Sequence, residues 1–131
     1  MSPNSRLIRI PTLVVAACLA LTALAVVGSA SAAGPVVRAT KTCKPPAYPG
    51  AGYFNSRIRA TNVTCSYAKE FVVAYYRCRI RNGGADGRCR VKVRRFSCTE
   101  VRESIPTEID ARVTCRRGTQ KIVHTYQQNI E

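Results

Sequence analysis

The sequence predicts an α+β fold in which one helix packs on a four-stranded antiparallel sheet, in the order β-α-β-β-β, with disulfides stapling the two layers. Only residues 65–79 carry apolar side chains at helical spacing. Four other stretches approach the two-residue period of a strand. The third observation is seven cysteines in 131 residues, because small secreted domains use disulfides to support a modest core.

The N-terminal segment, residues 1–32, is predicted to be a cleaved secretory signal peptide. Arg6 and Arg9 give it a positive start, and residues 13–27 form an apolar run without a charge. Ala30-Ser31-Ala32 then has the small-x-small form of a signal-peptidase site. We expect cleavage after Ala32 and a secreted protein.

Two alternatives for this segment remain open. Residues 15–18 resemble a lipoprotein cleavage box with Cys18 as the lipid acceptor, although the apolar run continues beyond Cys18. The second alternative is that the apolar run is an uncleaved membrane anchor, but fifteen apolar residues are short for a membrane span.

The mature chain would comprise residues 33–131 with 19 basic and seven acidic side chains, a net charge of +12. Its six cysteines predict three disulfides in an oxidising compartment rather than a zinc site. The sequence has one His, no CxxC and no glycine-rich phosphate loop, so we expect no metal and no small-molecule cofactor.

The predicted elements before the sheet hairpins are an arm, a strand and the helix. Residues 33–52 are rich in Pro and Gly and predict an extended arm tied down by Cys43, ahead of a single domain over residues 53–131. Residues 53–61 predict the first strand. Thr64 is the expected N-cap of the helix. One apolar stripe identifies the helix face that packs on the sheet: Ala68, Phe71, Val72 and Tyr75.

Residues 82–87 have the composition of a loop, and three strands follow them. Residues 90–98 alternate cations with apolar residues, and a one-residue slip predicts a β-bulge near Arg94-Arg95. Residues 100–108 are expected to form a loop. Residues 109–115 then alternate cleanly.

A hairpin turn is predicted over residues 116–119, with Gly118 supplying the positive φ that the turn needs. Beyond it, Ile122, His124 and Tyr126 return along the face of Val113, Ala111 and Ile109, which places His124 opposite Ala111.

The predicted topology suggests a disulfide pairing. It places Cys98 and Cys115 at opposite ends of neighbouring strands, roughly 20 Å apart and beyond bonding distance. We therefore expect the pairs Cys65–Cys98, Cys78–Cys115 and Cys43–Cys89. The alternative for the last two bonds is Cys78–Cys89 with Cys43–Cys115.

Three short motifs carry a resemblance to other proteins. They are Asn62-Val63-Thr64-Cys65 with Ala68, Val93-x-x-Phe96-x-Cys98, and residues 113–118 (Val-Thr-Cys-Arg-Arg-Gly). With the signal peptide, the chain resembles a group of uncharacterised small secreted, cysteine-containing proteins of high-GC Gram-positive bacteria. The resemblance implies a compartment and no activity. Arg95 stands where this group is expected to have Gly.

The strongest functional feature is basic. Arg90, Lys92 and Arg94 point to one face of their predicted strand, and Arg112 would lie beside them. Neighbouring like charges favour a polyanionic partner, such as an anionic polymer or the cell-envelope surface. The alternative is a solvated strand face. We predict a secreted, non-enzymatic, monomeric binding module.

Two other function classes remain open. A small secreted hydrolase of the microbial ribonuclease type would use His124 as its acid, with Arg112 and one of three acidic residues, Glu100, Glu103 or Glu108. The alternation argues against it, since Glu108 and Arg112 point away from the face of His124. An inhibitor of an extracellular enzyme would present a rigid loop, for which residues 83–88 are the candidate.

Overall fold

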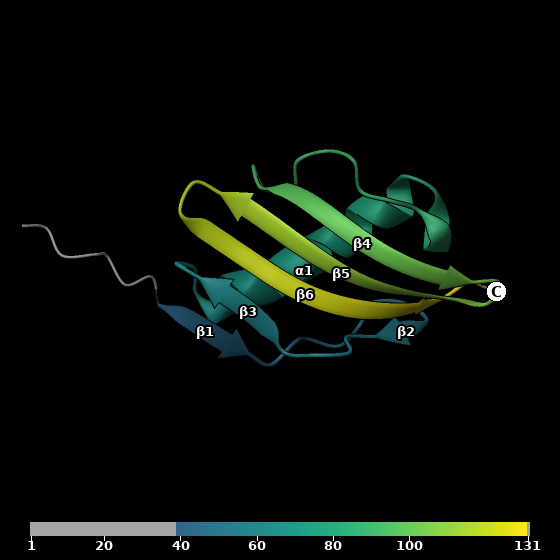
Figure 1. Ribbon diagram of the computed structural model, residues 1–131, viewed down its shortest axis with the longest axis horizontal. Helices are drawn as coiled ribbons and strands as arrows, with labels where there is room; N and C mark the ends of the chain where they lie inside the picture. The colour runs from purple at the N-terminus through teal and green to yellow at the C-terminus, as the bar shows by residue number, and fades with distance from the viewer. Residues whose placement is uncertain (1–38, 131) are drawn as a thin grey trace, which may run out of the picture. The chain divides into compact units, whose positions relative to one another are not determined.

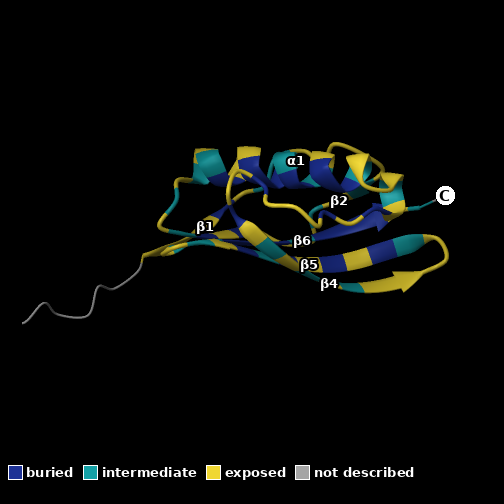
Figure 2. Cartoon of the chain, turned by 90° about the horizontal axis from the view of Figure 1, so that it is seen from above, coloured by how far each residue is buried: buried dark blue, intermediate teal, exposed yellow. Residues whose placement is uncertain are grey.

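The structure is a computed structural model that describes residues 39–130. The predicted signal peptide and its two alternatives lie outside these residues. The described residues form two layers, with one α-helix packed on one face of an antiparallel sheet (Figure 2). The predicted α+β class is therefore confirmed.

The sheet has six strands rather than the predicted four (Figure 1). Five strands lie in the order β1-β3-β6-β5-β4, and the short β2 pairs with β6. The elements are β1 (Thr40–Cys43), β2 (Gly52–Tyr53), β3 (Ile58–Thr61), α1 (Cys65–Arg81), the 3-10 helix η1 (Gly84–Asp86), β4 (Ser97–Ile105), β5 (Glu108–Arg117) and β6 (Gln120–Asn129).

Of the two additional strands, β1 lies within the segment that was predicted to be a separate arm, and β2 begins at the last residue of that segment. β1 pairs with β3 along its whole length, and Cys43 is buried at its end. Residues 53–61 do not form one strand, because β2 ends at Tyr53 and β3 begins at Ile58. Prolines 45, 46 and 49 fall between β1 and β2, where no ladder hydrogen bond is required. The arm therefore belongs to the domain.

The helix follows its sequence prediction and runs two residues further. Thr64 caps α1, since its Oγ1 accepts a 3.2 Å hydrogen bond from the backbone N–H of Tyr67. The predicted stripe of four residues is buried against the sheet. Asn82 is the C-cap of α1, and its side-chain amide donates to the carbonyl of Cys78 at 2.7 Å.

The second predicted strand is misplaced, and so is the predicted bulge. The chain reverses at Arg94 and Arg95, whose φ values are 46° and 68°. Val93 and Phe96 close this turn with backbone hydrogen bonds of 3.1 and 2.8 Å. Two positive φ values in succession are those of a type I′ turn. β4 therefore starts only at Ser97 and continues through the segment that was predicted to be a loop.

The last hairpin turns at Gly118, whose φ is 53°, as predicted. The loop has only two residues, so the register differs by two from the expected one. His124 lies opposite Val113, and Tyr126 lies opposite Ala111. The face of β6 that was predicted to be buried is nevertheless correct, since His124 and Tyr126 are both buried beneath α1.

All three predicted disulfides are wrong. The bonds are Cys43–Cys65, Cys78–Cys89 and Cys98–Cys115. The predicted topology put the last pair a strand length apart, but a turn at residues 106–107 makes β4 and β5 one hairpin. Cys98 then lies directly opposite Cys115, with Cα atoms 4.0 Å apart. Of the alternatives, only Cys78–Cys89 is found.

Three disulfides in so small a domain are consistent with an oxidising extracellular compartment. Within residues 39–130, no helix combines the length and hydropathy that crossing a membrane requires.

Candidate anion-binding site

The helix-facing side of β4 carries a buried carboxylate. The Glu100 side chain is 6% exposed and forms an ion pair with Arg102 at 2.7 Å. The hydroxyls of Tyr75 and Tyr126 donate to its Oε2 at 2.8 and 2.9 Å. One acid thus joins α1, β4 and β6 in a single polar network inside the domain.

Two buried arginines connect this network to the segment after the helix. Arg79 donates to the carbonyls of Ala85 at 2.8 Å and Gly87 at 3.2 Å. Arg102 donates to the carbonyls of Asp86 and Gly87, both at 2.8 Å. η1 is therefore held in place by guanidinium groups that reach it from the helix and from the sheet.

Gly87 has no space for a side chain in this arrangement. A Cβ atom at this position would collide with the carbonyl oxygen of Arg79. The close approach of the backbone to the helix end explains why glycine is needed here.

The buried groups of this network are two cations and one acid. The side chains of Arg79 and Arg102 face the buried carboxylate of Glu100, and Arg102 also lies 3.6 Å from the exposed carboxylate of Asp86. Burial and the nearby Glu100 raise the pKa of Tyr75 well above its ordinary value, so its hydroxyl stays a donor at neutral pH. Burial likewise raises the pKa of Tyr126. Because both tyrosines stay neutral, neither offsets the positive charge of an arginine.

Beside this network lies a hollow of about 420 Å³ between η1 and β4. We call it the arginine hollow. Its charged lining consists of three cations and one acid, Arg88, Arg90, Arg102 and Asp86. The rest of the lining is polar or glycine: Asn82, Gly83, Gly87 and Ser104. A hollow with this charge excess suits an anionic group. Arg102 supplies a buried Nε donor that has no acceptor among the described residues.

Residues 88–95 form the loop that borders this hollow, and we call them the cationic loop. Its five basic side chains are all exposed: Arg88, Arg90, Lys92, Arg94 and Arg95. The buried Cys89 and Val93 fix the loop to the core, and Cys89 also bonds to Cys78 of α1. The loop therefore displays its cations from a backbone that is anchored at two points.

The loop cations differ in how far they are already paired. Arg94 contacts Glu70 at 3.1 Å, and Arg88 contacts Glu100 at 3.4 Å. Within residues 39–130, Arg90, Lys92 and Arg95 have no acidic side chain within ion-pair distance. These three are the cations most available to a partner.

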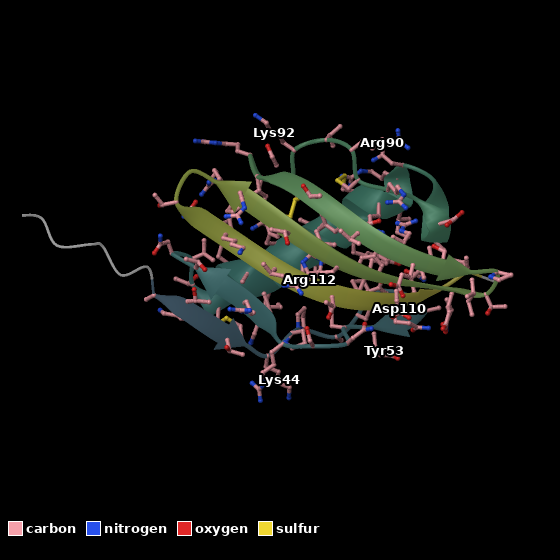
Figure 3. The ribbon with its side chains drawn as sticks, viewed as in Figure 1. Lys44, Tyr53, Arg90, Lys92, Asp110 and Arg112 are labelled. Atoms are coloured by element: carbon pink, nitrogen blue, oxygen red, sulfur yellow. A yellow bond between two sulfur atoms is a disulfide. The ribbon has the colours of Figure 1, made fainter. Side chains whose placement is uncertain are left out.

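The four predicted binding residues do not form one surface. Arg90, Lys92 and Arg94 lie in the cationic loop rather than on a strand. Arg112 lies on β5, on the sheet face away from the helix, and Figure 3 shows it well separated from Arg90 and Lys92. The reason is the misplaced strand, because the register puts Arg112 opposite Val101 rather than near Arg94.

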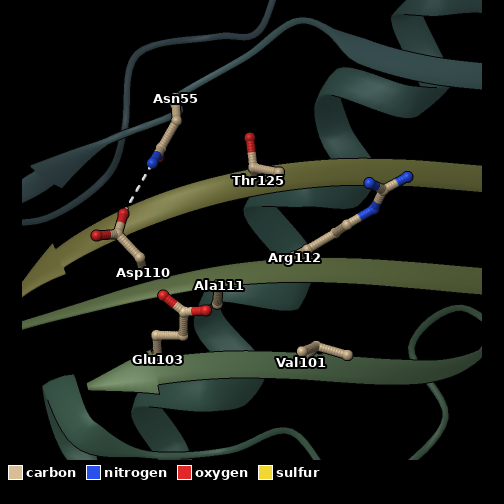
Figure 4. A pocket seen from close by; sticks show the side chains of 7 residues that line it. All are labelled: Asn55, Val101, Glu103, Asp110, Ala111, Arg112 and Thr125. Carbon is tan, nitrogen blue, oxygen red and sulfur yellow. Dashed lines mark hydrogen bonds between the residues drawn. The ribbon is translucent and has the colours of Figure 1, made fainter.

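Arg112 instead lines a shallow depression of about 440 Å³ on the outer sheet face (Figure 4). Glu103 and Asp110 lie directly opposite each other there, and Asn55 donates to Asp110 at 2.8 Å. Two carboxylates beside one guanidinium give this surface mixed charge. It does not favour a polyanion.

His124 is buried on the opposite side of the sheet from that depression. It is 2% exposed, and its ring centroid lies 5.4 Å from that of Tyr75. Burial, together with the positive charge of Arg79, lowers its pKa to about 3. Its Nδ1 has no hydrogen-bond partner among residues 39–130.

The residues of a ribonuclease-type site are not brought together. Glu103 and Arg112 lie on the outer face, whereas His124 lies beneath the helix. Glu108 accepts from the side-chain amide of Gln127 at 2.8 Å, and Glu100 is enclosed by arginines and tyrosines. A neutral, inaccessible imidazole cannot act as a general acid on a substrate.

The predicted inhibitor loop, residues 83–88, contains η1 and is held from within by Arg79 and Arg102. Neither Arg79 nor Arg102 was predicted from the sequence to be buried. A signal for Arg79 was its position four residues after Tyr75, on the same helix stripe. Glu100 and Arg102 lie two and four residues after Cys98 and therefore on the same face of the strand. Because the predicted strand was misplaced, this relation was not recognised from the sequence.

No family model matches the chain, and no curated protein or solved structure matches it either.

Proposed function

We propose that this chain is a secreted, non-enzymatic binding module for an anionic polymer of the cell envelope or extracellular space, contacted through the cationic loop. The observation that carries the proposal is the set of three exposed cations, Arg90, Lys92 and Arg95, without acidic partners in the described part of the chain. The contact surface is a loop, not the strand face predicted from sequence.

The anchoring of the loop supports this function. Because Cys89 and Val93 are buried and the turn at Arg94-Arg95 closes on Phe96, the loop backbone is ordered before a partner arrives. A preordered loop loses less conformational entropy on binding than a flexible one. Less of the favourable free energy of each phosphate, sulfate or carboxylate contact is then offset by the cost of ordering the loop, and the affinity is higher.

The compartment is part of the same proposal. The predicted signal peptide, three disulfides and the resemblance to small secreted bacterial proteins all favour secretion. Anionic polymers are the major charged material that a secreted bacterial protein would meet at the cell surface.

The test compares two triple variants of equal net charge. One changes Arg90, Lys92 and Arg95 to Gln; the control changes Lys44, Arg57 and Arg59, exposed cations that also lack an acidic partner within residues 39–130. Figure 3 shows Lys44 at the far edge from Arg90 and Lys92. Retention of the oxidised mature proteins is measured on heparin and duplex-DNA columns over a salt gradient.

We expect the loop variant to elute at much lower salt than the control variant. In solution, its slope of log affinity against log salt should fall by about 2 to 3, since about three counterion-releasing contacts are lost. Co-elution of the two variants would contradict the proposal, because retention would then follow total charge alone.

A further inference from the structure

The edge of the sheet at β4 has unpaired backbone groups. β4 pairs with β5 on one side and ends the strand order on the other. Since Ile105 and Glu108 flank a two-residue turn, their pair and every second pair from it use the hydrogen bonds to β5. The backbone groups of Cys98, Glu100, Arg102 and Ser104 consequently point outward.

No hydrogen bond within residues 39–130 uses these outward backbone groups. η1 contacts β4 through Arg102, which donates to the carbonyl of Asp86, and the cationic loop contacts it through Arg88 and Glu100; these contacts use side chains on the helix-facing side of β4. Figures 1 and 2 show β4 as the outermost strand on its side of the sheet. An unpaired strand edge is a template for another strand.

Side chains on the two sides of this edge differ in chemistry. On the helix-facing side the edge borders the arginine hollow, through Arg102 and Ser104. On the outer side, the two aliphatic side chains of β4, Val101 and Ile105, are 68% and 56% exposed. A strand that pairs with β4 would alternate its own side chains between these two surroundings.

We infer that the β4 edge binds an extended segment of an acidic protein, which adds a strand to the sheet. Its acidic side chains would enter the arginine hollow beside Arg88 and Arg90, and its alternate apolar side chains would cover Val101 and Ile105.

This inference goes beyond the proposed polymer binding, because it depends on the backbone of β4 as well as on charge. An anionic polysaccharide or duplex DNA presents no strand backbone to pair with. The two interactions can therefore fail independently.

The experiment uses a fluorescent, end-capped peptide of alternating valine and glutamate, with binding to the oxidised mature protein followed by anisotropy. A peptide of the same composition with its valines and glutamates in separate blocks is the matched control. We expect the alternating peptide to bind about tenfold more tightly than the blocked one. Equal binding would overturn the inference, because it would show recognition of charge alone.

The protein-side variant is Ser104→Pro, which removes one outward N–H, keeps every charge and spares the hydrogen bonds to β5. We expect about tenfold weaker binding of the alternating peptide, since proline also crowds the strand edge. Undiminished peptide binding by a correctly disulfide-bonded variant would refute the inference.

Two further measurements keep the result interpretable if Ser104→Pro misfolds. Amide hydrogen exchange of the unaltered protein should slow at Glu100, Arg102 and Ser104 when the peptide is present, and stay unchanged there if no strand is added. N-methylating every second peptide amide should weaken binding by a similar factor. Concentration-dependent dimers that block the peptide would identify a second copy as the occupant and overturn the assignment to an acidic partner.

Discussion

Glu100 is the buried acid of the polar network inside this domain. It accepts hydrogen bonds from two buried tyrosines and pairs with a buried arginine, while a second buried guanidinium lies 3.9 Å from it. Arg79 also stacks on Tyr126, with its guanidinium carbon 4.1 Å from the ring centroid. Removing the acid would leave Arg79 buried without a counterion, and Arg102 with only the exposed carboxylate of Asp86, 3.6 Å away.

We therefore expect Glu100→Gln to destabilise the domain by about 3 kcal/mol, the usual cost of breaking a buried ion pair. The measurement is urea unfolding of the oxidised protein. Glu103→Gln, on the exposed outer face of the same strand, is the control and should change stability by less than about 0.5 kcal/mol. Equal stability of the two variants would show that Glu100 is not essential to the network.

His124 gives the protein a predictable pH response. Its pKa is lowered from 6.5 to about 3 in the folded state, so between these values the unfolded chain binds the proton and the folded chain does not. The free energy of unfolding should thus fall as the pH decreases below 6.5, by up to about 1.4 kcal/mol per pH unit.

The response is measured by denaturant unfolding between pH 6.5 and 5, above the range where most carboxylates titrate. His124→Phe keeps a ring among Tyr75, Tyr126 and Phe54 and should abolish most of the slope. If the variant retains the full slope of the natural protein, another group is responsible.

At the scale of elements, the turn at Arg94-Arg95 is the most unusual feature. Both residues have positive φ, which costs about 1–2 kcal/mol for a residue with a Cβ, and glycine and asparagine usually occupy such turns. Each arginine nevertheless adds a cation to the exposed loop. We interpret this as stability given up for surface charge.

Arg95→Gly should accordingly raise the free energy of unfolding by about 1 kcal/mol and lower retention on heparin. Thermal and urea unfolding measure the first effect and the salt gradient measures the second. Arg90→Gly is the control, since Arg90 has no positive φ, and it should lower retention without stabilising the domain. A destabilised Arg95→Gly variant would contradict this interpretation.

Elements with a local signal were predictable from the sequence. The helix carries its stripe and its N-cap within a few residues, and Gly118 marks its turn directly. β4 was not predictable in this way. Its helix-facing side carries Glu100 and Arg102, polar residues that are buried only because α1 and η1 supply their partners, so the strand lacks an apolar alternation.

At the scale of the whole molecule, the disulfides connect neighbours in the fold. Cys43–Cys65 joins β1 to the start of the helix, and Cys78–Cys89 joins its last turns to the cationic loop. Only Cys98–Cys115 lies within a hairpin. The cationic loop is therefore covalently tied to the helix that carries Arg79.

A peptide map of the oxidised, proteolysed protein should show these three bonds. Removing the Cys78–Cys89 bond alone, by changing both residues to Ser, should weaken heparin retention as well as stability, because the loop loses one of its two anchors. Changing Cys98 and Cys115 to Ser is the matched control and should affect stability alone. A map with Cys65–Cys98 would contradict the topology.

The sequence by itself determined the fold class, the limits of the helix to within two residues, the face of β6 that is buried, and the excess of basic charge. These follow from local patterns of polarity and from composition. Tertiary structure alone decided the strand pairing, the disulfide partners and the grouping of Arg88, Arg90 and Arg102 around one hollow. The reason is that a turn at residues 94–95 and another at residues 106–107 set the register of β4, and register determines which distant residues meet.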